Sequence, residues 1–124
     1  MKVLLSIKPE FAEKIFNGTK KFEFRKSIFK NQQIKTVVVY ASSPVQKVIG
    51  EFEIEEIISE KPSKLWERTE KFAGITKAYF EEYFSIKDIA YAIKISKAKS
   101  FEEPLSLQND YGINSPPQSF MYLK

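Results

Sequence analysis

The stretch SIKPEFAEKIFNGTKKFEFRK, from Ser6 to Lys26, contains a strand end, a short helix and a charged strand in immediate succession. Pro9 suits the first position of a helix, where its missing N–H has no hydrogen-bond partner to lose. Gly18 suits the left-handed residue that follows a helix. Between them, apolar residues recur at intervals of three and four, which predicts a helix with one face on a core.

The strand that follows this helix alternates apolar and charged residues, so its two faces differ. Phe22 and Phe24 face one side, whereas Glu23 and Arg25 face the other. Strict alternation puts Lys20 on the side of the phenylalanines. Lys20 therefore lies either just before the strand or with its ammonium in a partly buried cleft. A desolvated lysine has a lowered pKa and can act as a base.

The remaining chain predicts an α+β fold of about six strands, with short helices gathered in two insertions. Strands are expected over residues 3–7, 21–25, 37–40, 50–54, 89–95, 97–103 and 119–123. Beyond the first helix, helices are expected over residues 62–72 and 76–84, the second capped by Thr76. A change of phase at Glu55 and Glu56 predicts a bulge or sheet corner, and such corners are typical of a closed or nearly closed barrel.

The length of 124 residues predicts one domain over residues 1–124. No cysteine occurs, which favours a cytoplasmic protein. The absence of histidine and cysteine excludes a zinc site and a histidine-based triad. The row Glu51, Glu53 and Glu55 is a solvated strand face more often than a magnesium site. We expect neither a metal nor another cofactor. No apolar run is long enough for a signal peptide or a membrane span.

Charge is distributed unevenly along the chain. Residues 1–50 carry ten Lys or Arg residues against three acids, whereas residues 51–124 carry ten against thirteen. A basic first part and an acidic remainder predict attraction of an anionic partner to one side of the molecule. A lysine-rich solvated surface is the alternative. The position of the basic part on the opening motif favours a binding face.

The residues from Lys8 to Arg25 follow the pattern K-P-x-x-A-x-x-I-x-x-G-x-K-x-x-E-x-R, which resembles the ASCH family, related to the PUA RNA-binding fold. The resemblance continues through YASSP (residues 40–44), IGEFEIEEI (49–57) and PPQSF (116–120). Within that superfamily the chain is similar to small microbial PUA-like predicted regulators. The resemblance implies a PUA-like pseudobarrel with a cleft between the first helix and the strands.

Eight residues are candidates for ligand binding. They are Lys8, Lys20, Glu23, Arg25, Ser42, Ser43, Gln118 and Ser119. A cation near the start of a helix, as at Lys8, favours an anion such as phosphate, although a solubilising lysine fits equally well. Ser42 and Ser43 suit a ligand edge or a plain turn before Pro44. Gln118 and Ser119 enter through the PPQSF resemblance, and the Gln118 amide could read a base edge.

Three functions are compatible with these residues. The first is a module that binds RNA or a nucleotide and recognises a nucleobase, unmodified or modified, in a basic cleft. The second follows from the resemblance, because some ASCH proteins are amidohydrolases that use a Lys–Thr–Glu set on 4-acetylcytidine. Lys20 matches that lysine, Glu23 stands at the threonine, and the glutamate falls near Glu70 or Lys71. If the protein is an enzyme, Lys20 and Glu23 are its catalytic candidates.

A ribonuclease activity, also linked to the family, is a less favoured form of the enzyme hypothesis. The third function is a regulatory module that binds a protein in transcription or translation control. We favour the binding module, with RNA or a nucleotide as partner and no membrane. Trp66 is expected in the core, because it shares the apolar stripe of its helix with Leu65 and Phe72.

Overall fold

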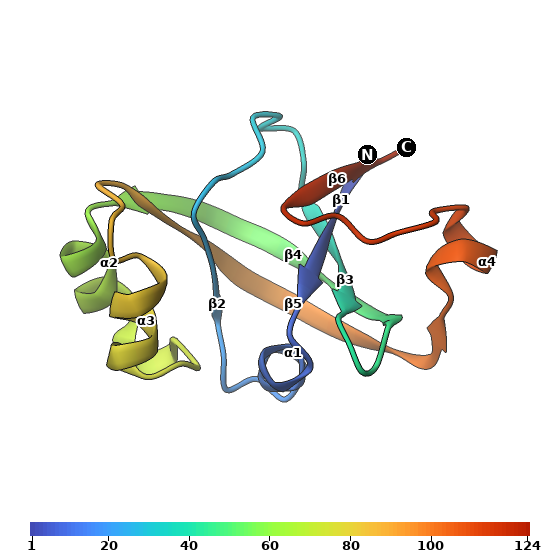
Figure 1. Ribbon diagram of the computed structural model, residues 1–124, viewed down its shortest axis with the longest axis horizontal. Coiled ribbons are helices and arrows are strands. Elements are labelled where there is room, and N and C mark those ends of the chain that lie inside the picture. The colour runs from blue at the N-terminus through green and yellow to red at the C-terminus, as the bar shows by residue number, and fades with distance from the viewer.

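The computed structural model describes residues 1–124 and contains a six-stranded sheet flanked by short helices (Figure 1). The strands are β1 (Lys2–Ile7), β2 (Phe22–Arg25), β3 (Thr36–Ala41), β4 (Lys47–Glu60), β5 (Ala90–Leu105) and β6 (Phe120–Leu123). The helices are α1 (Pro9–Phe16), α2 (Pro62–Thr69), α3 (Lys77–Tyr83) and α4 (Leu107–Tyr111), with a 3-10 turn η1 (Glu70–Phe72) after α2. The α+β prediction is therefore confirmed.

The strands follow the order β2-β5-β4-β3-β1-β6. Only β1 and β3 pair in parallel, and the other neighbours are antiparallel. The long strands β4 and β5 form a ribbon across the molecule, with α2 and α3 near one end and α4 near the other (Figure 1). The register of this ribbon shifts between Ile54 and Glu56, which confirms the predicted bulge.

The sheet is open, so of the closed or nearly closed barrel that the sequence predicts, the closed form is wrong. Strands β2 and β6 are its two edges, and neither pairs with the other. A side chain spans the seam instead: the guanidinium of Arg25, on β2, donates from Nη2 to the carbonyl oxygen of Ser119 at 2.7 Å. Ser119 directly precedes β6, so this bond joins the two edges of the sheet.

Helix α1 forms as the sequence predicts. Pro9 occupies its first turn, and Gly18 has a φ of +87° just beyond its end. Ala12 and Ile15 are buried in the largest hydrophobic cluster of the core, which also contains residues of β1, β3, β4 and β5. The helix is thereby fixed over one end of the β1–β3 pair.

A second hydrophobic cluster lies under α2 and α3 and covers the start of β5. The hydroxyl of Thr76 accepts a hydrogen bond from the backbone N–H of Tyr79 at 3.0 Å, so the predicted cap is present. Trp66 is partly buried against Phe80, with ring centroids 5.0 Å apart, which confirms its core position.

One expectation about the second half of the chain was wrong, and one helix was missed. The strands predicted over 89–95 and 97–103 are one strand, β5, in which Lys97 has a φ of +49°. Helix α4 was not predicted, although Ser106 caps its start and Gly112 takes the left-handed conformation at its end. No helix is long and apolar enough to cross a membrane.

Candidate functional site

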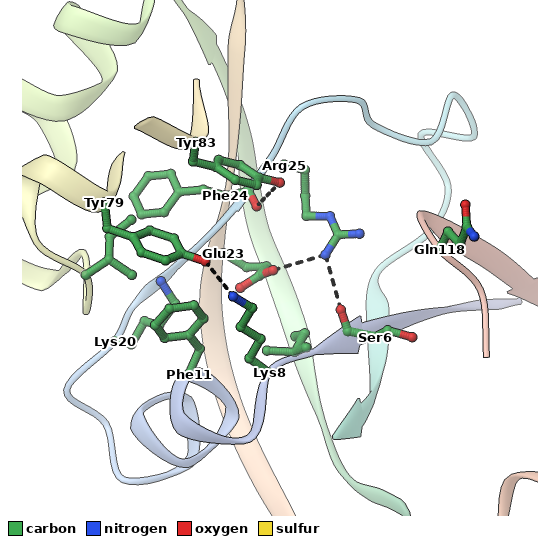
Figure 2. Close-up of a pocket in the computed structure, with 12 residues that line it drawn as sticks. Ser6, Lys8, Phe11, Lys20, Glu23, Phe24, Arg25, Tyr79, Tyr83 and Gln118 are labelled. Atoms are coloured by element: carbon green, nitrogen blue, oxygen red, sulfur yellow. Dashed lines mark hydrogen bonds and ion pairs between the residues drawn. The ribbon is translucent and has the colours of Figure 1, made fainter. Parts of the chain in front are cut away.

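A pocket of about 200 Å³ lies where α1, β2, α3 and the end of β1 meet (Figure 2). It is lined by Ser6, Ile7, Lys8, Phe11, Lys20, Glu23, Phe24, Arg25, Ile75, Tyr79, Tyr83 and Gln118. Only three polar or charged residues of the protein are buried, and two of them, Lys20 and Glu23, line this pocket. Larger hollows elsewhere on the surface lack such residues. The pocket is therefore the candidate site.

Lys20 reaches the pocket because the chain reverses after Gly18. The backbone N–H of Lys20 donates to the carbonyl oxygen of Lys14 at 3.0 Å, which places the residue just before β2. Its side chain is only 2% exposed, and Nζ donates to the carbonyl oxygen of Ala73 at 2.6 Å. Both alternatives for Lys20 therefore hold together: it precedes the strand, and its ammonium is buried.

Aromatic rings flank the Lys20 ammonium and remove it from water. Nζ lies 5.4 Å from the ring centroid of Phe11 and 4.9 Å from that of Phe24. Burial lowers the pKa of Lys20 to about 8, while the nearby Glu23 carboxylate opposes this shift and Lys14 adds to it. A substantial fraction of the amine is therefore neutral near pH 7.5.

Glu23 and Arg25 form an ion pair at the centre of the pocket. Arg25 Nη1 lies 3.2 Å from Glu23 Oε2, and the two side chains are 13% and 9% exposed. Nη1 also donates to the carbonyl oxygen of Ser6 at 3.4 Å. Arg25 holds one carboxylate oxygen of Glu23. The other oxygen has no partner among the hydrogen bonds of the protein, so it can accept one from a ligand.

Lys8 and two tyrosines, Tyr79 and Tyr83, form another part of the pocket lining. Lys8 Nζ donates to the hydroxyl of Tyr79 at 3.2 Å, and this bond raises the pKa of Lys8. Tyr83 donates to the carbonyl oxygen of Phe24 at 3.4 Å, and burial raises its pKa. The Tyr79 and Tyr83 rings are nearly parallel, with an interplanar angle of 16° (Figure 2).

Five of the eight predicted ligand residues line the pocket, namely Lys8, Lys20, Glu23, Arg25 and Gln118. Gln118 is exposed and lies beyond Arg25 from the tyrosines (Figure 2). Ser119 does not line the pocket; its carbonyl oxygen holds Arg25, and its hydroxyl lies 3.3 Å from that of Ser27.

Ser42 and Ser43 also lie outside the pocket, in the turn between β3 and β4. The Ser42 N–H donates to the carbonyl oxygen of Ile7 at 3.0 Å, which fixes the turn beside the end of β1. A neighbouring turn residue, Val45, lines a different hollow together with Pro9 on α1. Neither serine lines the pocket, which agrees with the plain-turn interpretation.

Sequence reasoning missed the aromatic wall of the pocket. The spacing of Phe11 on α1 and of Tyr79 and Tyr83 on α3 predicts only that they lie on the apolar stripe of a helix, and all three are half-buried. The Phe11 and Tyr79 rings meet edge to face with centroids 5.3 Å apart. A signal was present in the hydroxyl groups of Tyr79 and Tyr83, which share one face of α3 but need polar partners when buried.

Other candidate positions lie away from the pocket. Glu70 and Lys71, on η1, are exposed and do not line it. The carboxylates of Glu51, Glu53 and Glu55 pair with different lysines, at 2.9, 3.4 and 2.8 Å. No group of three or more acidic residues has the geometry to hold a metal ion.

Residues 5–99 match the family model of the ASCH domain. The chain belongs to the ASCH family. In particular, it resembles a Zymomonas mobilis protein named ASCH domain-containing ribonuclease, with 30% identity over 124 residues that cover 98% of this chain and 83% of that protein. A crystal structure of ASCH from Zymomonas mobilis has a TM-score of 0.92 and 28% identity, and covers 99% of this chain and 87% of that chain.

Other relatives are larger proteins. The large ribosomal subunit protein uL22 of Ureaplasma parvum is 30% identical over 122 residues, which are 98% of this ASCH chain and 39% of that protein. The ATP synthase subunit alpha of the same species is 31% identical over 123 residues, 98% of this chain but 15% of that protein. The N-terminal domain of Staphylothermus marinus McrB shares the fold, with a TM-score of 0.56 and 13% identity.

Proposed function

We propose that this ASCH domain binds single-stranded RNA and takes one nucleobase into the pocket between α1, β2 and α3. The observation that carries the proposal is the meeting of cations, a buried carboxylate and aromatic rings in one concavity. Cations attract the phosphate backbone, whereas aromatic faces and carboxylate oxygens bind an unstacked base. The family membership and the relative named a ribonuclease support RNA as the partner.

Each wall of the pocket has a separate part in this proposal. Lys8 is exposed beside the start of α1, where it can meet a phosphate. The half-buried Tyr79 offers a ring on which a base can stack. The oxygen of Glu23 that Arg25 does not hold accepts from a base amino or imino group, modified or unmodified. The exposed Gln118 can donate to and accept from a base edge at the Arg25 side of the pocket.

Salt dependence tests the proposal. Fluorescence anisotropy with a labelled single-stranded RNA should give an affinity that falls as salt rises. Lys8→Ala should reduce the slope of log K against log salt by about 0.7, the value of one lost phosphate contact. Tyr79→Ala should lower affinity roughly tenfold with the slope unchanged, because base stacking is not a counterion effect.

The matched control is Lys64→Ala, which removes an exposed lysine on α2 outside the pocket. It should leave both affinity and slope as they are in the parent protein. No measurable binding at low salt, or equal losses for Lys8→Ala and Lys64→Ala, would contradict the proposal.

Cleavage of the bound RNA is a second candidate, favoured by the name of the Zymomonas mobilis relative. Glu23 could accept the proton of a 2′-hydroxyl while Lys20 stabilises the negative charge that develops on the phosphate. The RNA from the binding experiment, separated on a denaturing gel, tests this reaction. Cleavage that is equal for the parent protein and Glu23→Gln excludes the pocket as its source.

The amidohydrolase alternative has less support. It requires an acid in the region of Glu70 or Lys71, and both side chains are exposed outside the pocket. A glutamate, Glu23, also stands where the family's set has a threonine. A regulatory protein-binding role stays a prediction without an identified partner surface.

A further inference from the structure

We infer that the Lys20 amine is a nucleophile that forms an imine with an aldehyde group carried by a bound nucleotide. The nucleotide part of this inference rests on the proposed function. The reactivity of Lys20 rests on the pocket alone.

Lys20 is buried without a counter-ion. None of the six ion pairs in the protein includes it, so no carboxylate oxygen lies within 4.0 Å of Nζ. Its one hydrogen-bond partner is a neutral group, the carbonyl oxygen of Ala73. A buried ammonium without a paired charge favours its neutral form. The absence of a paired carboxylate makes the neutral amine accessible, as an amine nucleophile requires.

The surroundings also orient the reactive nitrogen. A neutral amine has two N–H groups and one lone pair. The bond to Ala73 uses one N–H, which leaves the lone pair and the second N–H for the pocket. Gly74 packs closely along the aliphatic stem of Lys20, where any side chain on residue 74 would collide with it. The nitrogen is therefore held beside the ring of Phe11 (Figure 2).

The reaction is balanced without an oxidant or a reductant. The Nζ lone pair attacks the aldehyde carbon, a C–N bond forms, and the carbonyl electron pair moves to oxygen. A proton passes from nitrogen to that oxygen to give a carbinolamine. Loss of the oxygen as water, with a second proton from nitrogen, gives the imine. One amine and one aldehyde thus yield one imine and one water.

The pocket also suits the product. The imine nitrogen can take up a proton from solvent, and the protonated imine then has one N–H that can donate to the carbonyl oxygen of Ala73. Its positive charge lies near the Glu23 carboxylate and the ring faces of Phe11 and Phe24. Glu23 on β2 and Lys14 on α1 are the charged groups that act on Lys20, and Lys8 lines the same pocket.

Two nucleotide aldehydes share the required chemistry. One is a formyl group on a base, and the other is the open-chain sugar of an abasic site. Both carry the phosphodiester that Lys8 attracts, and both present the aldehyde on a group that can enter a small pocket with apolar walls.

Reductive trapping tests the inference. Single-stranded RNA with one 5-formylcytidine, the same RNA with one abasic site, and the unmodified RNA are each incubated with the protein and cyanoborohydride. Cyanoborohydride reduces an imine to a stable secondary amine, which survives a denaturing gel. We expect a covalent complex with at least one of the two aldehyde strands and none with the unmodified strand. Peptide mass spectrometry should place the adduct on Lys20.

Two lysine variants and a simple aldehyde complete the design. Lys20→Arg keeps the charge but not the nucleophile and should abolish trapping, whereas Lys64→Arg, at an exposed lysine outside the pocket, should not change it. Pyridoxal 5′-phosphate, also reduced in place, labels a reactive lysine without any RNA. At pH 7.5 an amine with a pKa of about 8 should react roughly two orders of magnitude faster than an ordinary lysine.

The possible failures are distinguishable. Adducts spread over exposed lysines at the rate of Lys20 overturn the inference. Labelling of Lys20 by pyridoxal 5′-phosphate but by neither aldehyde strand overturns the assignment to nucleotides. If the unmodified RNA binds normally and Lys20 is never labelled, the inference fails while the proposed function stands. If no RNA binds but pyridoxal 5′-phosphate labels Lys20, the proposed function fails and the amine chemistry stands.

Discussion

At the scale of single residues, the ammonium of Lys20 opposes folding. Its pKa falls to about 8 in the folded protein, so the unfolded chain binds this proton more tightly. A group of this kind lowers stability fully below the folded pKa, and the effect disappears as pH rises toward the unfolded value near 10.5. The free energy of unfolding should therefore rise between pH 7 and 9.5, with a Lys20 contribution of roughly 2 kcal/mol.

Urea denaturation at several pH values measures this rise. In Lys20→Met the contribution should vanish, so its stability should change less over the same range. Lys21→Met is the matched control, because Lys21 is adjacent and exposed, and it should keep the slope of the parent protein. A Lys20→Met variant with the parent's pH slope would show that the buried amine does not titrate in this window.

The sequence was sufficient to bring Lys20, Glu23 and Arg25 together, because a four-residue strand and the turn before it connect them. It was not sufficient for the aromatic wall. Tyr79 lies more than 50 positions further along the chain, and its place beside Phe11 depends on how α3 packs on β2. Side-chain periodicity shows that a residue is on the inner face of a helix, but not which element it will meet.

At the scale of elements, the link between η1 and α3 shapes the pocket through Gly74. Gly74 has a φ of +70°, and a Cβ there would lie 2.5 to 2.8 Å from three carbons of the Lys20 side chain. Gly74→Ala should lower the free energy of unfolding by roughly 2 to 4 kcal/mol, from backbone strain and overpacking together. It should also displace Lys20 and weaken its trapping by aldehydes.

Gly112→Ala is the matched control for Gly74→Ala. Gly112 has nearly the same φ, +69°, but no atom lies within 4 Å of the added methyl group. Both variants introduce backbone strain, but only Gly74→Ala also overpacks the Lys20 side chain. In thermal unfolding, Gly74→Ala should therefore lose more stability than Gly112→Ala. Equal losses would mean that contact with Lys20 adds nothing.

The elements themselves were predicted with mixed success. Helix α1 followed from Pro9 and Gly18, because both residues fix the backbone by local chemistry. The strand in the second half of the chain could not be predicted from local chemistry in the same way. At Lys97 the backbone takes a positive φ and yet β5 continues, because pairing with β4 resumes on both sides. A local irregularity and a strand end have the same appearance in a sequence.

At the scale of the whole molecule, Arg25 joins two sheet edges that the backbone leaves unpaired. Its guanidinium contacts Glu23 and the carbonyl oxygens of Ser6 and Ser119. Arg25→Ala should cost roughly 3 kcal/mol of stability, because it leaves the Glu23 carboxylate buried without its partner. Hydrogen exchange should become faster at the amides of β6, which loses its connection to β2.

Arg68→Ala provides the comparison. Arg68 also pairs with carboxylates, those of Glu56 and Glu60, but its side chain is 50% exposed, so its loss should change stability by less than about 1 kcal/mol. The double variant Glu23→Gln with Arg25→Ala should recover part of the loss, since no unpaired charge remains. An Arg25→Ala variant as stable as Arg68→Ala would show that the seam needs no side-chain bridge.

The pairing of β1 with β6 has a further consequence. Lys2 lies opposite Leu123, so the first and last residues leave the sheet side by side (Figure 1). A host polypeptide could therefore enter and leave this domain at nearly the same place, with little distortion of the host backbone. Such a domain can be grafted into a surface loop of another protein while the pocket between α1, β2 and α3, beyond the opposite end of β1, stays untouched.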